Sequence, residues 1–109
     1  MKLETAERLS SKDVTEEELI NAFQDDAARG EFIILSQSDQ VFIQAAGEYD
    51  DPYLVEYRDG DDEHHFYAAN DLPKERVQQL FIQYLAGNPS WHTDIEWIKQ
   101  EKKPWWKFW

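Results

Sequence analysis

The chain has 109 residues and carries 23 acidic and 11 basic side chains, which gives a formal net charge of −12. Its length predicts one domain with a modest core. The absence of cysteine excludes a disulfide framework, a thiolate metal site and a cysteine nucleophile. The acidity argues against nucleic acid as a partner, because phosphate binding needs a basic surface.

The N-terminal residues show no apolar stretch of signal-peptide length, and the longest strongly apolar run covers only residues 32–35. Such a run is far too short to span a bilayer. We therefore expect a cytoplasmic protein. An aromatic content of 15% argues against wholesale disorder despite the high charge.

The first predicted helix covers residues 16–28 and follows a polar segment, residues 1–13, that we expect to be frayed. Thr15 and Glu18 match the capping box, in which two residues satisfy each other's backbone N–H groups at a helix start. Gly30 is suited to end the helix in a left-handed conformation. Apolar side chains recur every four residues and form one stripe: Leu19, Phe23 and Ala27.

Four strand-like runs follow, over residues 32–36, 41–46, 53–58 and 63–69. Asp59-Gly60 between two β-rich runs is a strong hairpin signal. The connections are too short for parallel crossovers, so neighbouring strands must be antiparallel. The sequence therefore predicts a four-stranded meander in chain order.

A second helix is predicted after the strands, with Asp71 as its N-cap, Pro73 in its first turn and Gly87 at its end. Its apolar residues have helical spacing: Val77, Leu80, Phe81 and Tyr84. Residues 94–97 alternate in polarity and are predicted to form a short edge strand.

These elements predict a two-layer α+β sandwich in which both helices cover one face of the sheet. Residues 1–98 form this domain and residues 99–109 a tail. Strand alternation assigns one set of side chains to the helix-covered face: Val41, Ile43, Ala45, Tyr53, Val55 and Tyr57. The opposite, open face receives Phe42, Gln44, Leu54, Glu56 and Arg58.

The segment Asp59-Gly60-Asp61-Asp62-Glu63-His64-His65 is the richest in potential metal ligands. Its spacing is not that of an EF-hand, and adjacent histidines in a strand point to opposite faces. We therefore favour a solvated hairpin turn over a metal site. No glycine pattern cradles a phosphate, and no serine, histidine or carboxylate constellation indicates catalysis. We expect a protein without enzymatic activity, metal or cofactor.

The tail, residues 99–109, contains four lysines and one glutamate, so it carries +3 while residues 1–98 carry −15. Four of its last five residues are aromatic. Three interpretations remain open: Trp105 or Trp106 folds back onto the open face, the tail binds a partner, or it lies at a membrane interface. Anionic lipid would repel the acidic body, which weakens the third.

Acidic residues gather in the predicted loops at strand ends: Asp50, Asp51, Asp59, Asp61, Asp62 and Glu63. We expect these loops to form one acidic rim that steers basic proteins toward the chain. Phe42, Glu56, Trp105 and Trp106 complete the candidate partner-binding residues. The acidity could also serve solubility alone.

Several runs of core and turn residues are similar to those of a known group of proteins. They are Phe32-Ile33-Ile34-Leu35, Val41-Phe42-Ile43-Gln44-Ala45, Leu54 to Gly60, and Phe81 to Gly87 followed by Trp91 and Trp97. Over residues 15–98 the chain resembles small acidic bacterial proteins of the polymorphic-toxin immunity type. The resemblance implies an α+β protein that neutralises a cognate toxin by docking on it. It covers core and turn residues and leaves the tail outside.

Two function classes therefore stay open. The first is an immunity-type binding protein, monomeric or weakly dimeric, that covers a basic toxin or effector. The second is a secretion-chaperone-like adaptor, which would dimerise and hold an unfolded effector segment.

Overall fold

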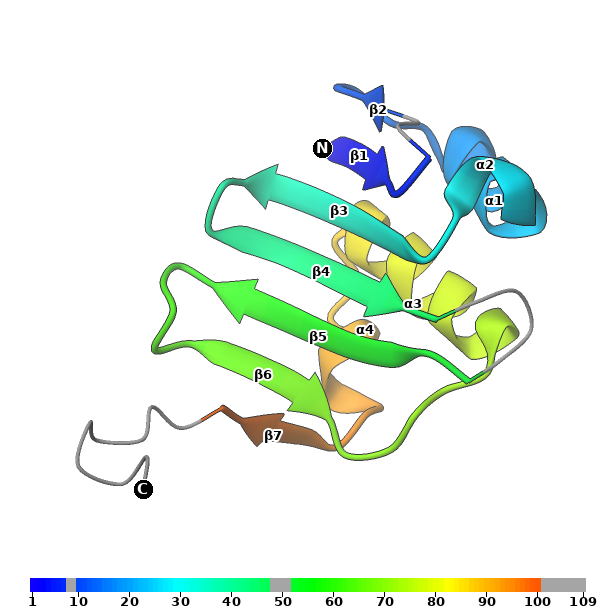
Figure 1. Ribbon diagram of the computed structural model, residues 1–109. Helices are drawn as coiled ribbons and strands as arrows, with labels where there is room; N and C mark the ends of the chain where they lie inside the picture. The colour runs from blue at the N-terminus through cyan, green and yellow to red at the C-terminus, as the bar shows by residue number, and fades with distance from the viewer. Residues whose placement is uncertain (8–9, 48–51, 101–109) are drawn as a thin grey trace, which may run out of the picture.

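An antiparallel sheet forms one layer of the computed structural model, which describes residues 1–7, 10–47 and 52–100 (Figure 1). Within these residues the sheet has seven strands in the order β2-β1-β3-β4-β5-β6-β7. They are β1 (Lys2–Thr5), β2 (Ser10–Ser11), β3 (Phe32–Ser38), β4 (Val41–Ala46), β5 (Leu54–Asp59), β6 (His65–Ala68) and β7 (Trp97–Lys99). The predicted meander is confirmed as β3 to β6. The full sheet adds β1 and β2 at one edge and β7 at the other.

The prediction of a frayed N-terminus is wrong for the described residues. β1 pairs with β3 in the register Leu3 to Leu35, and Leu3 is only 1% exposed. Val14, which follows β2, is also buried. The segment is ordered because β1 satisfies the outer backbone groups of β3 while Leu3 extends the core. The apolar residues of segment 1–13, Met1, Leu3, Ala6 and Leu9, do not keep the two-residue alternation of a strand, so the sequence shows no sign of β1.

The predicted first helix is present as two helices, α1 (Glu16–Gln24) and α2 (Asp26–Arg29). Its start is confirmed: the Glu18 N–H donates to Thr15 Oγ1 at 3.2 Å, and the Thr15 N–H donates to Glu18 Oε1 at 3.1 Å. Its continuity is wrong, because Asp25 adopts φ −104° and ψ 89° and ends α1.

The fully buried side chain of Arg29 accounts for this break. Its guanidinium donates to the carbonyl oxygens of Ala22 and Phe23 near the end of α1, where backbone acceptors lack helical partners. It also donates to the Tyr53 hydroxyl at 2.7 Å and pairs with Asp26. Because a buried charge needs hydrogen-bond partners, α2 must hold Arg29 against the end of α1 and against Tyr53, which precedes β5.

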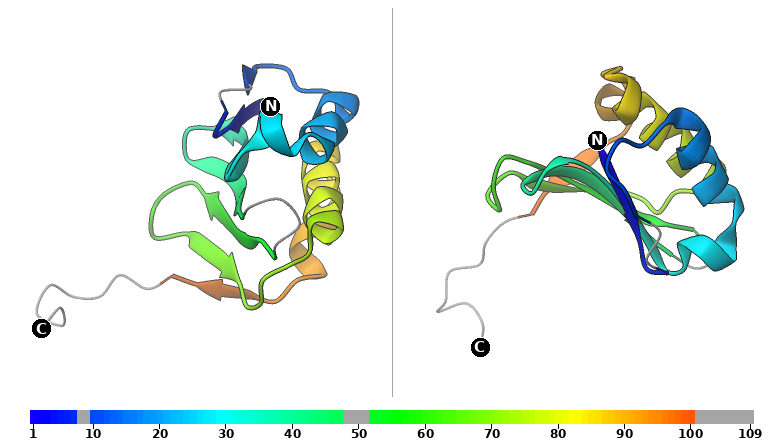
Figure 2. Two further views of the ribbon diagram at one scale, coloured as in Figure 1. Left: turned by 45° about the vertical axis from the view of Figure 1, so that its right-hand side comes forward. Right: turned by 90° about the horizontal axis from the view of Figure 1, so that it is seen from above.

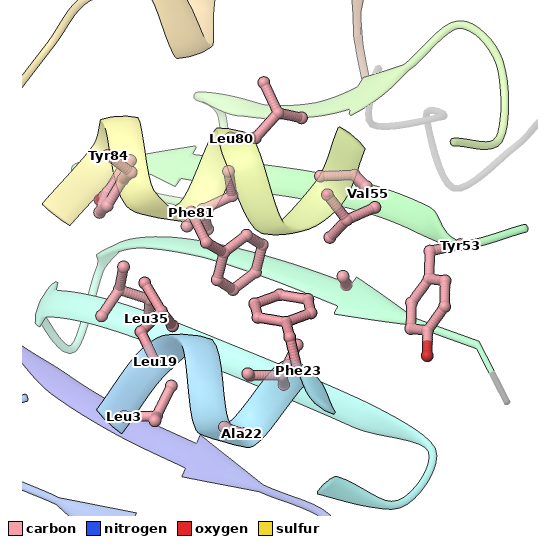
Figure 3. Close-up of a cluster of buried hydrophobic side chains, with 14 of the residues drawn as sticks. Leu3, Leu19, Ala22, Phe23, Leu35, Tyr53, Val55, Leu80, Phe81 and Tyr84 are labelled. Atoms are coloured by element: carbon pink, nitrogen blue, oxygen red, sulfur yellow. The ribbon is translucent and has the colours of Figure 1, made fainter. Parts of the chain in front are cut away.

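The core lies between the sheet and the long helices, α1 and α3 (Lys74–Ala86), which cover the same face (Figures 2 and 3). The two helices meet through the rings of Phe23 and Phe81, whose centroids are 5.2 Å apart in an edge-to-face arrangement. The face assignment is confirmed: Ile43, Ala45, Tyr53, Val55 and Tyr57 are buried under the helices, and Val41 is half-buried. Phe42, Gln44, Leu54, Glu56 and Arg58 are exposed or half-buried.

The second predicted helix is confirmed as α3, and Gly87 ends it at φ +72°. Asp71 is not its N-cap; Pro73 takes that position without a side-chain cap. The predicted strand at residues 94–97 is shifted, because a short helix, α4 (Ser90–Thr93), precedes β7. The Trp97 indole N–H donates to the His92 carbonyl at 3.0 Å and fixes this later start.

Arg29→Met should lower the free energy of unfolding by about 3 kcal/mol, because it removes a fully buried guanidinium and leaves its buried hydrogen-bond acceptors without their donor. Urea denaturation measures the loss. The matched control is Arg76→Met, because the Arg76 side chain on α3 is half-buried and bonds to the neighbouring Gln79 side chain of the same helix. This variant should lower the free energy of unfolding by less than about 1 kcal/mol. Equal losses in the two variants would contradict the role given to Arg29.

Candidate functional site

Two turns lie side by side at one end of the sheet, the β3–β4 turn and the β5–β6 turn (Figure 1). The Gly60 N–H donates to the Gln40 carbonyl at 2.8 Å and joins them. Five exposed carboxylates gather here, a set that we name the acidic end: Asp39, Asp59, Asp61, Asp62 and Glu63. The meander places segments that are 20 residues apart in the sequence at one surface.

Asp61 holds the β5–β6 turn in shape. Its carboxylate accepts from the backbone N–H groups of Glu63 at 3.0 Å and His64 at 3.1 Å, and from the His64 ring at 2.7 Å. The hydrogen bond from His64 is the main reason that the Asp61 pKa lies below its ordinary value. Gly60 has φ +106°, a conformation that favours glycine. The turn is therefore held by hydrogen bonds to Asp61, and its other carboxylates are exposed to solvent.

The acidic end contains four of the residues predicted from the sequence: Asp59, Asp61, Asp62 and Glu63. It adds Asp39, which the sequence reasoning missed although alternate turns of a meander share one end. Asp50, Asp51, Trp105 and Trp106 lie outside the described residues.

Phe42 and Glu56 lie on the open face, where Phe42 borders the same hollow as Asp39 of the acidic end, and the polar neighbours of the two residues pair with one another. Gln44 donates to Glu56 at 2.6 Å, and the His65 ring lies 3.5 Å from the other Glu56 oxygen. Arg58 donates to His65 Nδ1 at 3.2 Å and stacks over the Phe42 ring. His65 is only 6% exposed although it faces outward, because these side chains cover it.

The open face also carries three exposed apolar side chains, Phe32, Leu54 and Ile98. Phe32 and Leu54 flank Ala46 on neighbouring strands, and Ile98 lies on the edge strand β7. A hollow of about 310 Å³ lies near the β1 side of this face, lined by Lys2, Glu4, Ile34, Ser36, Ser38, Asp39, Phe42 and Gln44.

A second hollow, which we name the end pocket, lies on the helix-covered side next to the acidic end. It has a volume of about 320 Å³ and is lined by Gln37, Val41, Tyr57, Arg58, Asp59, Tyr84, Trp91 and His92. Its residues come from β3, β4, β5, α3 and α4. Gln37 lies where the β3–β4 register shifts between Ser36 and Ser38, and such a bulge re-aims a side chain.

Aromatic rings form the wall of the end pocket. Trp91 packs edge-to-face against Tyr57 and against Tyr84, each at a centroid distance of 5.0 Å. The Tyr57 hydroxyl lies 3.0 Å from His92 Nε2. Burial and the nearby charge of Asp59 raise the Tyr57 pKa, so this hydroxyl stays protonated at neutral pH.

Tyr84 is the buried polar residue of the end pocket, and it stands at one end of the core cluster in Figure 3, with Tyr53 at the other. It is only 4% exposed, and its hydroxyl makes no hydrogen bond of normal geometry within the described part of the chain, although the Gln37 side chain lies near it. Burial raises its pKa to about 12; hydrogen bonding by the Gln37 side chain opposes this shift, and the Asp59 charge adds to it. The hydroxyl therefore faces Gln37 and Asp59, two residues of the pocket lining.

The described residues contain no cluster of three or more histidine, aspartate or glutamate side chains placed to hold a metal ion. His64 pairs with Asp61, whereas His65 is covered on the open face. No helix in the described ranges is long and apolar enough to cross a membrane.

Comparison with known proteins identifies no relative of this chain: no family model, curated protein or solved structure matches it. Its function must therefore be inferred from the acidic end, the open face and the end pocket.

Tyr84→Phe should reduce the loss of stability that the protein shows in alkali. The folded-state pKa of Tyr84, about 12, lies above the ordinary value of 10.0, so the unfolded chain releases this proton first. Its contribution is fully present below pH 10 and is lost as the pH rises toward 12. Part of the loss remains in the variant, because the pKa values of Tyr53 and Tyr57 are also raised by burial.

Urea denaturation at a series of alkaline pH values measures this effect. At neutral pH the variant should be as stable as the wild type or more stable, by up to about 1 kcal/mol, because it removes a buried hydroxyl that makes no hydrogen bond of normal geometry to the described residues. A variant that is strongly destabilised at neutral pH would show that the hydroxyl has a partner.

Proposed function

We propose that this protein is a non-enzymatic binding domain of immunity type, which neutralises a basic toxin or effector by docking its acidic end on that protein. The observation that supports the proposal is the gathering of five exposed carboxylates from two sequence-distant turns at one end of the sheet. A surface on which carboxylates predominate steers and orients a basic partner.

Docking through the acidic end is favoured over docking through the open face, because charged groups on the open face are already paired with one another whereas those of the acidic end face solvent. On the open face, Glu56 is engaged by Gln44 and His65, and Arg58 is engaged by His65 and Gln40. A partner would have to break this network to use its charges. At the acidic end, Asp59 and Glu63 are solvent-exposed.

The tyrosine–histidine contact in the end pocket gives little support to catalysis. A general base activates a hydroxyl best when the pKa of that hydroxyl is lowered toward neutrality. The Tyr57 pKa is raised instead. A neutral phenol beside His92 supports a binding role for the pocket over a nucleophilic one.

Neutralising the acidic end should weaken binding of a basic probe, the peptide octa-arginine. The variant Asp59→Asn/Asp61→Asn/Asp62→Asn keeps the oxygen acceptors of the turn and removes three charges. We expect about tenfold weaker binding at low salt, because the variant loses three charges that attract the arginine side chains. Isothermal titration calorimetry at several salt concentrations measures it, and raising the salt should reduce the difference.

The matched control removes three exposed charges at the opposite end of the sheet, in Glu31→Gln/Asp71→Asn/Glu75→Gln. It has the same net charge as the acidic-end variant and should bind nearly as tightly as the wild type. Equal weakening by both variants would mean that net charge alone attracts the probe. A stable homodimer in sedimentation would contradict the immunity type and favour the adaptor.

A further inference from the structure

The end pocket lies directly beside the acidic end, and the two share Asp59. The buried Tyr84 hydroxyl makes no hydrogen bond of normal geometry within the described residues, although the Gln37 side chain lies near it, so a ligand that supplies a donor would satisfy it better. The pocket is large enough, at about 320 Å³, for one side chain of a partner. The position and the unsatisfied hydroxyl together indicate a specific binding site within the docking surface.

The charges around the pocket favour a cation. Asp59 lies close enough to Tyr57 and Tyr84 to raise the pKa of both, so its carboxylate charge acts inside the pocket. Arg58 also borders the pocket, but its guanidinium is held on the open face by Gln40, His65 and Phe42. The positive charge is therefore directed away from the pocket and the negative charge toward it.

The shape and chemistry of the lining favour a planar guanidinium over a compact ammonium. Aromatic rings of Tyr57, Tyr84 and Trp91 form the wall, and guanidinium groups stack on such rings. The oxygens of Asp59, Gln37 and Tyr84 provide several acceptors around one space. A guanidinium has five N–H donors in a fixed fork and can use such acceptors at once.

We propose that the end pocket takes one arginine side chain of the partner, with Asp59 as the charge partner and the Tyr84 hydroxyl as an acceptor for a guanidinium N–H. The proposal rests on the proposed function, because it names the anchor residue of the basic partner. The pocket proposal goes beyond the docking proposal, because it assigns one arginine of the partner to a defined pocket. The other basic residues of the partner are only attracted by the charge of the acidic end.

The test uses N-acetyl-arginine methylamide as a probe and its neutral, nearly isosteric citrulline analogue as the ligand control. Binding is followed by the shift of backbone amide signals in NMR titrations. We expect millimolar binding of the arginine probe, appropriate to one side chain, and none of the citrulline probe. Asp59→Asn should weaken binding about tenfold and Tyr84→Phe about fivefold.

Glu63→Gln is the matched control, since it removes one exposed charge from the same turn but lies outside the pocket lining. It should change the affinity by less than about twofold. The proposed arginine site would be contradicted if Asp59→Asn and Glu63→Gln weakened binding of the arginine probe equally. Equal affinity for the arginine and citrulline probes would also contradict it.

Failure of the pocket and failure of the proposed function give different results. If octa-arginine binds the acidic end but the arginine probe does not bind, the pocket is wrong and the docking surface stands. A second variant, Asp61→Asn/Asp62→Asn/Glu63→Gln, removes three charges of the acidic end and leaves Asp59 in the pocket. If the arginine probe binds as expected but this variant binds octa-arginine as well as the wild type does, the pocket stands and the docking surface is wrong.

Discussion

Burial on only one face of the sheet is the constraint on which the structure depends. Side chains alternate along β4 and β5, so Ile43, Ala45 and Val55 all point to the same side and must be covered there. The helices α1 and α3 provide the cover and meet through Phe23 and Phe81. The same constraint leaves the other face to a paired polar network and directs the turns of the meander to the two ends of the sheet.

The functional proposals follow from how the ends differ. At one end the β3–β4 and β5–β6 turns meet and expose the acidic end, while α3 and α4 close over the strands to leave the end pocket. At the other end the Arg29 side chain is fully buried and donates to the Tyr53 hydroxyl, so its positive charge is not exposed on the surface. Five exposed carboxylates thereby gather on a surface that the fold itself shapes.

Local signals were sufficient for much of the fold. The Thr15–Glu18 capping box, the alternation in β4 and β5 and the Gly87 stop each depend on neighbours within a few residues. The break after α1 depends on Arg29 reaching Tyr53, 24 residues away, and β1 depends on pairing with β3. For the site, the β5–β6 turn was predictable from Asp59-Gly60. The end pocket was not, because the bulge at Gln37 and the packing of Tyr84 against Trp91 are tertiary features.

Mapping the amide chemical-shift changes that octa-arginine causes along the whole chain is the most direct test of this account. We predict that the largest changes lie at residues 37–40, 58–64 and 91–92, which form the acidic end and the adjoining pocket. The changes should fade as salt is added. If the largest changes lie instead around Phe32, Leu54 and Ile98, the partner surface is the open face and the account is contradicted.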